Sequence, residues 1–336
     1  MKEKLRLAIY WGAGCGGCEV SVLDINEKIL NVAAVADIVL FPLGMDFKYS
    51  DVRNYPDGWI DICLFNGSIR NSEAEEIAHL LRKKSKVMIA YGSCAHMGGI
   101  PGLGNLANKN KIFEIAYKKT ASTNNPTDTF PLPRCEVNEG ELELPEFYDT
   151  VRALDQVIDV EYYLPGCPPT VKWINAAIDL IVSGNLPPKG SVIGLKKTVC
   201  DECPREKTEK VVTEFKRFYE VIPDPDKCLL EQGIICNGPA TRGGCEAACP
   251  SVNMPCRGCF GPTDEVVDQG MKLTSSIASI VNAENEEEAA EKINKIVDPM
   301  GTFYTYGLPK SLLHRARMDN QIKVDEVKEV LEKEKV

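Results

Sequence analysis

Four cysteines fall within fifteen positions of a segment that has little else to hold it together. The segment, residues 245–262, reads CEAACPSVNMPCRGCFGP, with thiols at Cys245, Cys249, Cys256 and Cys259. It shows neither the alternation of a strand nor the apolar stripe of a helix. Metal–thiolate bonds can organise such a segment in place of an apolar core. The spacing therefore predicts a metal centre here.

Four further cysteines precede this segment and complete a group of eight. They are Cys200, Cys203, Cys228 and Cys236. Eight thiols form two sets of four, and four thiolates can hold either a [4Fe–4S] cluster or a structural zinc ion. The spacing alone does not choose between the two metals. A zinc-stapled binding protein with no redox role therefore stays an alternative.

The first half of the chain carries another four thiols, each placed after a predicted strand. These are Cys15, Cys18, Cys94 and Cys167. Because ligands of open parallel sheets bind outside the carboxyl ends of the strands, we expect the four thiols to meet at one edge. The last two cysteines, Cys63 in a predicted strand and Cys135 in an irregular segment, are interpreted as bystanders.

The strands and helices expected in the first half of the chain alternate, and they would position the first set of thiols. Strands are expected over 5–12, 37–43, 61–69, 86–94 and 159–167, and helices over 20–36, 72–85 and 168–184. This alternation predicts an α/β fold with a doubly wound parallel sheet. Residues 121–150, rich in Thr, Asn, Pro and Glu, are expected to form an irregular insertion loop.

The second half is poorer in such signals. A linker is expected over 185–190, and a helix over 205–220 separates two of the cysteine pairs. Further helices are predicted over 264–281 and 285–297, and a charged amphipathic helix over 324–336.

Composition bounds the class of protein. The chain has 336 residues and a formal charge of −10, which argues against broad nucleic-acid binding because phosphate contacts need clustered Lys and Arg. No signal peptide or membrane-spanning apolar run is recognisable. We therefore expect a cytoplasmic protein, in which fourteen cysteines favour metal ligation over disulfides.

Taken together, the motifs resemble the small, electron-transferring subunit of [NiFe] hydrogenases. WGAGCGGCEVS, YGSCAHMGGIPG and LPGCPPT are similar to that family's proximal-cluster ligand sites, and residues 228–262 to its medial and distal cluster region. The resemblance covers residues 5–262. It implies a flavodoxin-like domain over 1–186 with the proximal cluster. An irregular and helical iron–sulfur cluster-binding domain, with a helical tail, is implied over 187–336.

The resemblance assigns twelve cysteines to three [4Fe–4S] clusters. The proximal ligands are Cys15, Cys18, Cys94 and Cys167, the medial ligands are Cys245, Cys249, Cys256 and Cys259, and the distal ligands are Cys200, Cys203, Cys228 and Cys236. Many members have histidine where this chain has Cys200, and proline where it has Cys249. All-cysteine ligation is similar to the cytoplasmic F420-non-reducing (viologen-reducing) hydrogenases of methanogens.

The function implied by the resemblance is electron relay in a soluble hydrogenase. Hydrogen is split at a Ni–Fe centre held by a partner large subunit. Electrons then pass through the three clusters to a small iron–sulfur subunit linked to heterodisulfide reductase. The small subunit of an F420-reducing hydrogenase is the alternative inside the family. A quinone-reductase subunit of the complex I kind has one cluster, and the eight C-terminal cysteines count against it.

Two titratable residues near these motifs, Glu19 and His96, have two interpretations each, and a third titratable residue, His79, has one. A glutamate at the position of Glu19 is associated in the family with proton transfer, but a carboxylate in a helix first turn is equally explained by the helix dipole. His96, two residues after Cys94, either donates to cluster sulfur or lies on the surface of its loop, and the surface position is preferred. His79 is expected to be structural.

Overall fold

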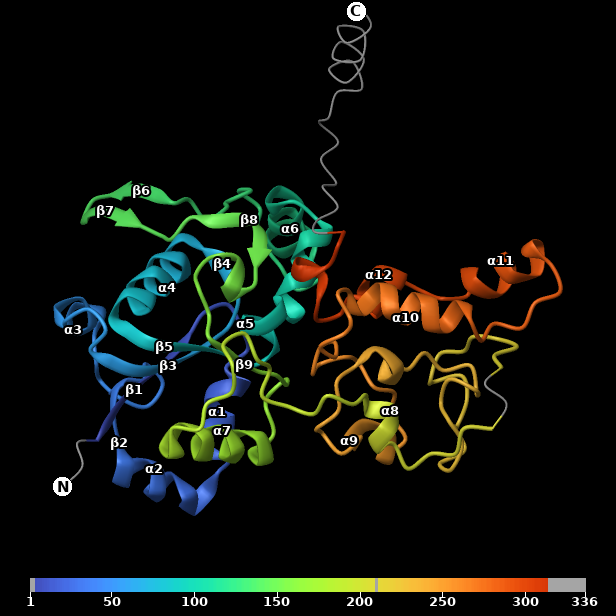
Figure 1. Cartoon of the computed structure of the whole chain (residues 1–336). Helices are drawn as coiled ribbons and strands as arrows, with labels where there is room; N and C mark the ends of the chain where they lie inside the picture. The colour runs from blue at the N-terminus through green and yellow to red at the C-terminus, as the bar shows by residue number, and fades with distance from the viewer. Residues whose placement is uncertain (1–3, 209–210, 314–336) are drawn as a thin grey trace, which may run out of the picture.

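A computed structural model describes residues 4–208 and 211–313 (Figure 1). Its N-terminal lobe is built on one five-stranded sheet whose neighbouring strands all run parallel. In spatial order the strands are β2 (Ala36–Leu40), β1 (Leu5–Trp11), β3 (Ile60–Asn66), β5 (Ser85–Tyr91) and β9 (Tyr162–Leu164). This is the flavodoxin-like order. The predicted doubly wound α/β fold is confirmed.

Helices cover both faces of this sheet (Figure 1). One face carries α1 (Gly17–Leu23), α2 (Ile29–Val35) and α7 (Val171–Ser183), and the other carries α3 (Tyr49–Asn54), α4 (Ser72–Lys84) and α5 (Ser93–Met97). Successive side chains of a strand point to opposite faces. Ile9 of β1 therefore packs with Ile174 of α7, while its neighbour Ala8 packs in the core that holds Ile77 of α4.

The insertion over 121–150 is more regular than predicted. It contains an exposed hairpin of β6 (Arg134–Val137) and β7 (Gly140–Glu143). The following strand β8 (Phe147–Arg152) pairs antiparallel with β4 (Ile69–Asn71). A short helix α6 (Lys109–Glu114), continued by a π-helical stretch over Ile115–Lys119, precedes the insertion. Polar composition alone had concealed the strands because none of the hairpin's residues is buried.

One predicted helix is broken into shorter pieces, and another is absent from the described residues. The helix over 20–36 is interrupted between α1 and α2, because Asn26 adopts a left-handed φ of 54° and donates to the carbonyl of Asp24. The helix over 205–220 does not form in the described residues 205–208 and 211–220. Val212 pairs there with Val281, and Lys216 with Ile234, so extended backbone carries the buried apolar side chains into the core.

The C-terminal lobe has little regular structure around its cysteines. It contains α8 (Val199–Glu202), α9 (Ala248–Ser251), α10 (Gln269–Ala278), α11 (Glu286–Asn294) and α12 (Pro299–Phe303). Helices α10 and α11 lie inside the two helical segments predicted after residue 262. The last described segment returns to the sheet lobe, where Gly99 N–H donates to the Tyr306 carbonyl. The helix predicted over 324–336 lies outside the described residues.

None of the helices in the described part of the chain is long and apolar enough to cross a membrane.

Candidate metal centres

The first cysteine set gathers at the carboxyl edge of the sheet. Cys15 and Cys18 follow β1, Cys94 lies in α5 after β5, and Cys167 follows β9. Burial, and after it the thiols of Cys94, Cys167 and Cys15, raise the pKa of Cys18. Burial and then Cys167 and Cys15 raise the pKa of Cys94 to about 12. The structure thus brings all four thiols of this set together, as the strand positions predicted.

Glycines leave the space that these sulfurs occupy. A Cβ atom added to Gly92 would overlap the Sγ of Cys18, and one added to Gly99 would lie 2.5 Å from the Sγ of Cys94. Both glycines have positive φ, at 85° and 60°. Only glycine combines this backbone with so close an approach to a thiol.

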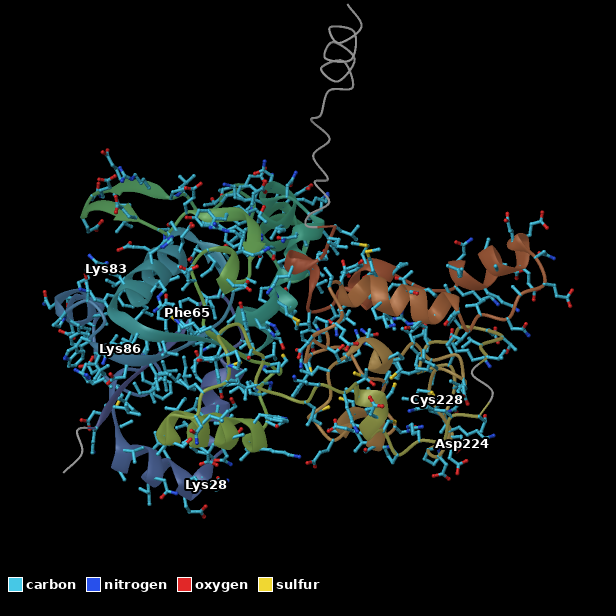
Figure 2. The ribbon with its side chains drawn as sticks, viewed as in Figure 1. Lys28, Phe65, Lys83, Lys86, Asp224 and Cys228 are labelled. Atoms are coloured by element: carbon cyan, nitrogen blue, oxygen red, sulfur yellow. The ribbon has the colours of Figure 1, made fainter. Side chains whose placement is uncertain are left out.

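The second set lies in the C-terminal lobe, where Figure 2 labels Cys228, and consists of Cys200, Cys203, Cys228 and Cys236. Burial and then Cys236, with smaller effects of other members, raise the pKa of Cys200 to about 12. Burial also raises the pKa of Cys236 to about 11, with further increases from Cys228 and Cys203. A Cβ atom on Gly238 would lie 3.0 Å from the Sγ of Cys200. The thiols of the second set therefore also lie close to one another.

The third set, Cys245, Cys249, Cys256 and Cys259, lies between the other two. Burial, and after it Cys167, Cys245 and Cys249, raise the pKa of Cys259 to about 12. The Ser93 hydroxyl of α5 donates to the Cys259 carbonyl. On the other side, the backbone N–H of Cys256 donates to the Sγ of Cys236 at 3.2 Å. The three sets thus form one continuous series across the two lobes.

The donor chemistry fits metal–thiolate binding. Thiolates gathered in mutually repelling sets need a cation to neutralise them, and iron–sulfur clusters bound by four cysteines supply one. Within residues 4–208 and 211–313, no three His, Cys, Asp or Glu side chains form a ready site for a single metal ion. The fit therefore rests on the thiol sets and on the glycines that line them.

The two remaining cysteines lie apart from the three sets. Cys63 is buried in β3, where burial raises its pKa to about 12, and Cys135 is exposed in β6. Their places agree with the interpretation that they are bystanders.

Glu19 is a buried carboxylate beside the first set. The residue is 1% exposed in the first turn of α1. One carboxylate oxygen accepts from the Asn66 side-chain amide, and the other, Oε2, has no partner among the described residues. Burial raises the pKa of this carboxyl, which the Asn66 hydrogen bond opposes. A carboxylate that interacted only with the helix dipole could stay exposed to solvent, whereas the Glu19 carboxylate is buried.

Known proteins resemble this chain along nearly its whole length. Residues 15–181 match the family described as NADH ubiquinone oxidoreductase, 20 Kd subunit. The iron–sulfur subunit of the F420-non-reducing hydrogenase of Archaeoglobus profundus is 41% identical over 93% of this chain and 98% of that protein. The corresponding F420-non-reducing hydrogenase subunit of Methanothermobacter thermautotrophicus is also 41% identical, over 93% and 97%. This chain belongs to that family of F420-non-reducing hydrogenase subunits. The predicted family, and with it an oxidoreductase subunit, is confirmed.

More distant relatives and solved structures also align with this chain. Sulfhydrogenase 2 subunit delta of Pyrococcus furiosus is 24% identical over 77% of this chain and 87% of that protein. An NAD+-reducing [NiFe]-hydrogenase structure aligns at 28% identity with a TM-score of 0.47, covering 55% of this chain and 94% of the other. A [NiFeSe] hydrogenase from Desulfovibrio vulgaris Hildenborough aligns at 17% identity with a TM-score of 0.49, over 78% and 95%.

His96 is not the surface residue that the sequence favoured. It is buried in α5, and its ring lies 4.9 Å from that of Tyr163. Burial, and then the charges of Lys310 and Arg242, lower its pKa well below the usual value. None of the hydrogen bonds described for the chain joins His96 to a cysteine sulfur. His79 lies exposed on α4, in a helix as expected.

Two buried arginines that organise the cysteine loops were missed in the sequence. Arg205 donates to the carbonyls of Pro250, Asp224 and Lys227 and to Asn253 Oδ1, at 2.6 to 2.9 Å. Those bonds tie the loops that carry Cys228 and Cys249. Arg242 holds the carbonyl of Leu195 at 2.8 Å. The sequence offered one signal for each: an arginine that stands alone in a segment with few apolar residues can be buried there to hold the loops together.

Proposed function

We propose that this chain relays electrons from hydrogen oxidation through three [4Fe–4S] clusters. The observation that carries the proposal is the continuous series of three four-thiol sets. The series is linked by Cys259 beside Cys167 and by the Cys256 N–H bond to Cys236. Relatives that carry the name of hydrogenase iron–sulfur subunit support the same chemistry.

The ligand sets follow from the same series. Cys15, Cys18, Cys94 and Cys167 would hold the proximal cluster, Cys245, Cys249, Cys256 and Cys259 the medial cluster, and Cys200, Cys203, Cys228 and Cys236 the distal cluster. A [4Fe–4S] cluster supplies one-electron redox chemistry where it is bound. The chain's own residues fix the separations, exclude water and donate backbone hydrogen bonds to the sulfurs.

Two domains would share this work. We place the boundary at 186/187, with the proximal set in the flavodoxin-like domain and the other two sets in the second domain. The Ni–Fe centre would lie in a partner large subunit, against the edge that carries Glu19. Fourteen free thiols favour a reducing, cytoplasmic compartment.

An exposed apolar patch marks the outer end of the series. It consists of Ile222, Val252 and Met254 on two loops that meet, with Ile222 95% exposed, and the exposed rings of Phe218 and Tyr219 precede Ile222 on the first loop. The Asn253 side chain donates to the Pro223 carbonyl at 3.0 Å, which joins the two loops. Arg205 also donates to the carbonyl of Lys227, the residue before Cys228. An apolar surface beside the last thiol set is suited to a protein electron acceptor. We assign it to a small iron–sulfur subunit linked to heterodisulfide reductase.

Metal analysis tests the proposal. The complex of this chain with its large subunit, purified without oxygen, is assayed for iron, acid-labile sulfide, nickel and zinc. We expect about twelve irons and twelve sulfides from this chain, beyond those of its partners. Zinc near three per chain with little iron would instead establish a zinc-stapled binding protein.

A further inference from the structure

A cleft of about 730 Å³ lies where the two lobes meet. Its walls come from α5, from β9, from the connecting segment 187–196, from the loop over 262–264 and from the last described turn. No cysteine lines it. The volume lies in the range of about 300–1,000 Å³ that small-molecule sites usually have.

Basic side chains outnumber acidic side chains in the lining of this interlobe cleft. Lys189, Lys196, Arg242 and Lys310 face one acidic lining residue, Asp264. This excess of cations occurs in a chain with a formal charge of −10. The His96 ring also lines the cleft.

Some of these cations are paired with carboxylates at the margin of the cleft. Arg242 Nη2 bonds Asp264 at 2.5 Å, and Lys310 bonds Asp155 at 2.6 Å. Lys189 lies 3.6 Å from Glu161, a carboxylate already bonded at 2.6 Å by Arg82. Lys196 has no ion pair among the described residues. The cleft and its margin thus contain five cationic side chains, counting Arg82, and the three carboxylates named above. The difference is a net charge of two positive units.

Buried polar groups in the wall have unused hydrogen-bonding capacity. Arg242 is 1% exposed, and its Nε hydrogen has no acceptor among the described residues. Nδ1 of His96 likewise has no partner there. A buried guanidinium with an incomplete set of acceptors favours an anion nearby, because burying unpaired charge is costly.

One side of the cleft offers flat, weakly polar surface. Lys310 Nζ lies 5.2 Å from the centroid of the Tyr163 ring. The same part of the cleft is lined by Pro187, Pro188 and Pro262. Such surfaces accommodate the organic part of a ligand whose charged end meets the lysines.

We propose that the interlobe cleft binds a phosphate group, carried by a small organic molecule or present as free phosphate. A phosphate monoester carries about two negative charges near pH 7, which matches the two unbalanced positive charges. Lys196 and Lys189 contact the phosphate, and the buried Arg242 supplies fixed positive potential behind them. Because the ligand bridges both lobes, its binding stabilises their junction.

Calorimetric titration tests this site on the whole complex of this chain and its large subunit. The probes are inorganic phosphate and AMP, in a low-salt buffer free of phosphate and sulfate. We expect one site per chain. Tighter binding of AMP identifies an organic phosphate, and equal or tighter binding of inorganic phosphate identifies the free ion.

Charge-reversal variants locate the binding. Lys196→Glu and Lys189→Glu change exposed side chains and should each weaken binding at least tenfold. Lys28→Glu makes the same charge change on an exposed residue outside the cleft, labelled in Figure 2, and should leave the affinity unchanged. Iron content checks that each variant folds.

Three results would overturn the proposal. The first is no heat of binding from either probe at millimolar concentration. The second is an equal affinity in Lys196→Glu and Lys28→Glu. The third is binding of a polyglutamate peptide in the absence of binding by either probe, which would make the cleft a receptor for an acidic protein segment.

Discussion

Glu19 combines burial with an unpartnered oxygen, and it lies one residue from a predicted cluster ligand. A carboxyl whose pKa is raised by burial takes up and releases protons nearer to neutral pH than an exposed one. Replacing it by glutamine keeps the shape and the Asn66 contact but removes the proton site. We expect Glu19→Gln to slow H2/H+ isotope exchange by about 100-fold, with iron content unchanged.

The control for this substitution is Glu27→Gln, which alters an exposed carboxylate a few residues further along. Its exchange rate should equal that of the unmodified complex. Unimpaired exchange in Glu19→Gln would remove proton transfer from the roles of this residue and leave the dipole interpretation.

Residue types with rigid chemical requirements were the predictable part of the candidate site. All twelve cysteines assigned from motifs lie in three crowded sets, because thiol spacing carries the ligand pattern in the sequence itself. The burial of His96 was not predictable, since it depends on Tyr163, a residue 67 positions away in the chain. Arg205 was missed for the same reason: its four acceptors lie in segments 19 to 48 residues away.

At the scale of elements, the loop after β5 is shaped by its glycines. Gly92→Ala forces a Cβ atom onto the Cys18 sulfur. We expect this variant to lose the proximal cluster, which is about a third of the iron of this chain, and with it hydrogen-driven dye reduction. Iron analysis together with the electron paramagnetic resonance spectrum of the reduced complex measures the loss.

Gly58→Ala is the matched control. Gly58 also has a positive φ, of 66°, but an added Cβ atom meets nothing within 4 Å. Gly58→Ala therefore controls for placing alanine at positive φ on an open surface, whereas Gly92, with a ψ of 167°, combines a backbone that favours glycine with the contact to the Cys18 sulfur. A full complement of iron in Gly92→Ala would contradict the assignment of this loop to the proximal cluster.

Whether a helix or strand could be predicted from the sequence depended on how its residues pack in the fold. Long, covered strands such as β3 and β5 were found because both faces are buried and read as apolar runs. The helix expected over 205–220 failed because Val212 and Phe215 are buried under α10 in extended backbone, so tertiary contact overrides helical propensity. The β6–β7 hairpin was not predicted because all of its residues are exposed and it contributes nothing to the core.

At the scale of the whole molecule, the proposed relay uses the outer thiol set only for the last electron step, so hydrogen chemistry at the other end should not require it. Cys203→Ala should reduce hydrogen-driven reduction of the protein acceptor to a small fraction, while H2/H+ isotope exchange in the same complex is preserved. Cys135→Ala, which removes an exposed thiol outside the sets, should change neither activity. Equal loss of both activities in an assembled Cys203→Ala complex would contradict a distal role for this set.

The apolar patch around Ile222 gives the relay a direction in space, because it lies at the end of the series remote from Glu19. A carboxylate placed there must be desolvated when an apolar partner docks, and this weakens docking without touching a thiol. We expect Ile222→Asp to raise the KM for the iron–sulfur acceptor subunit about tenfold, equivalent to about 1.4 kcal/mol.

Reduction of a small viologen dye, which needs no docking surface, should be unchanged in Ile222→Asp. Leu142→Asp makes the same change on the exposed β6–β7 hairpin, at the opposite end of the molecule from α8 (Figure 1), and should leave both activities intact. If Ile222→Asp reduced the acceptor subunit as efficiently as Leu142→Asp, the acceptor would have to dock elsewhere. The electrons would then leave the series before its outer set.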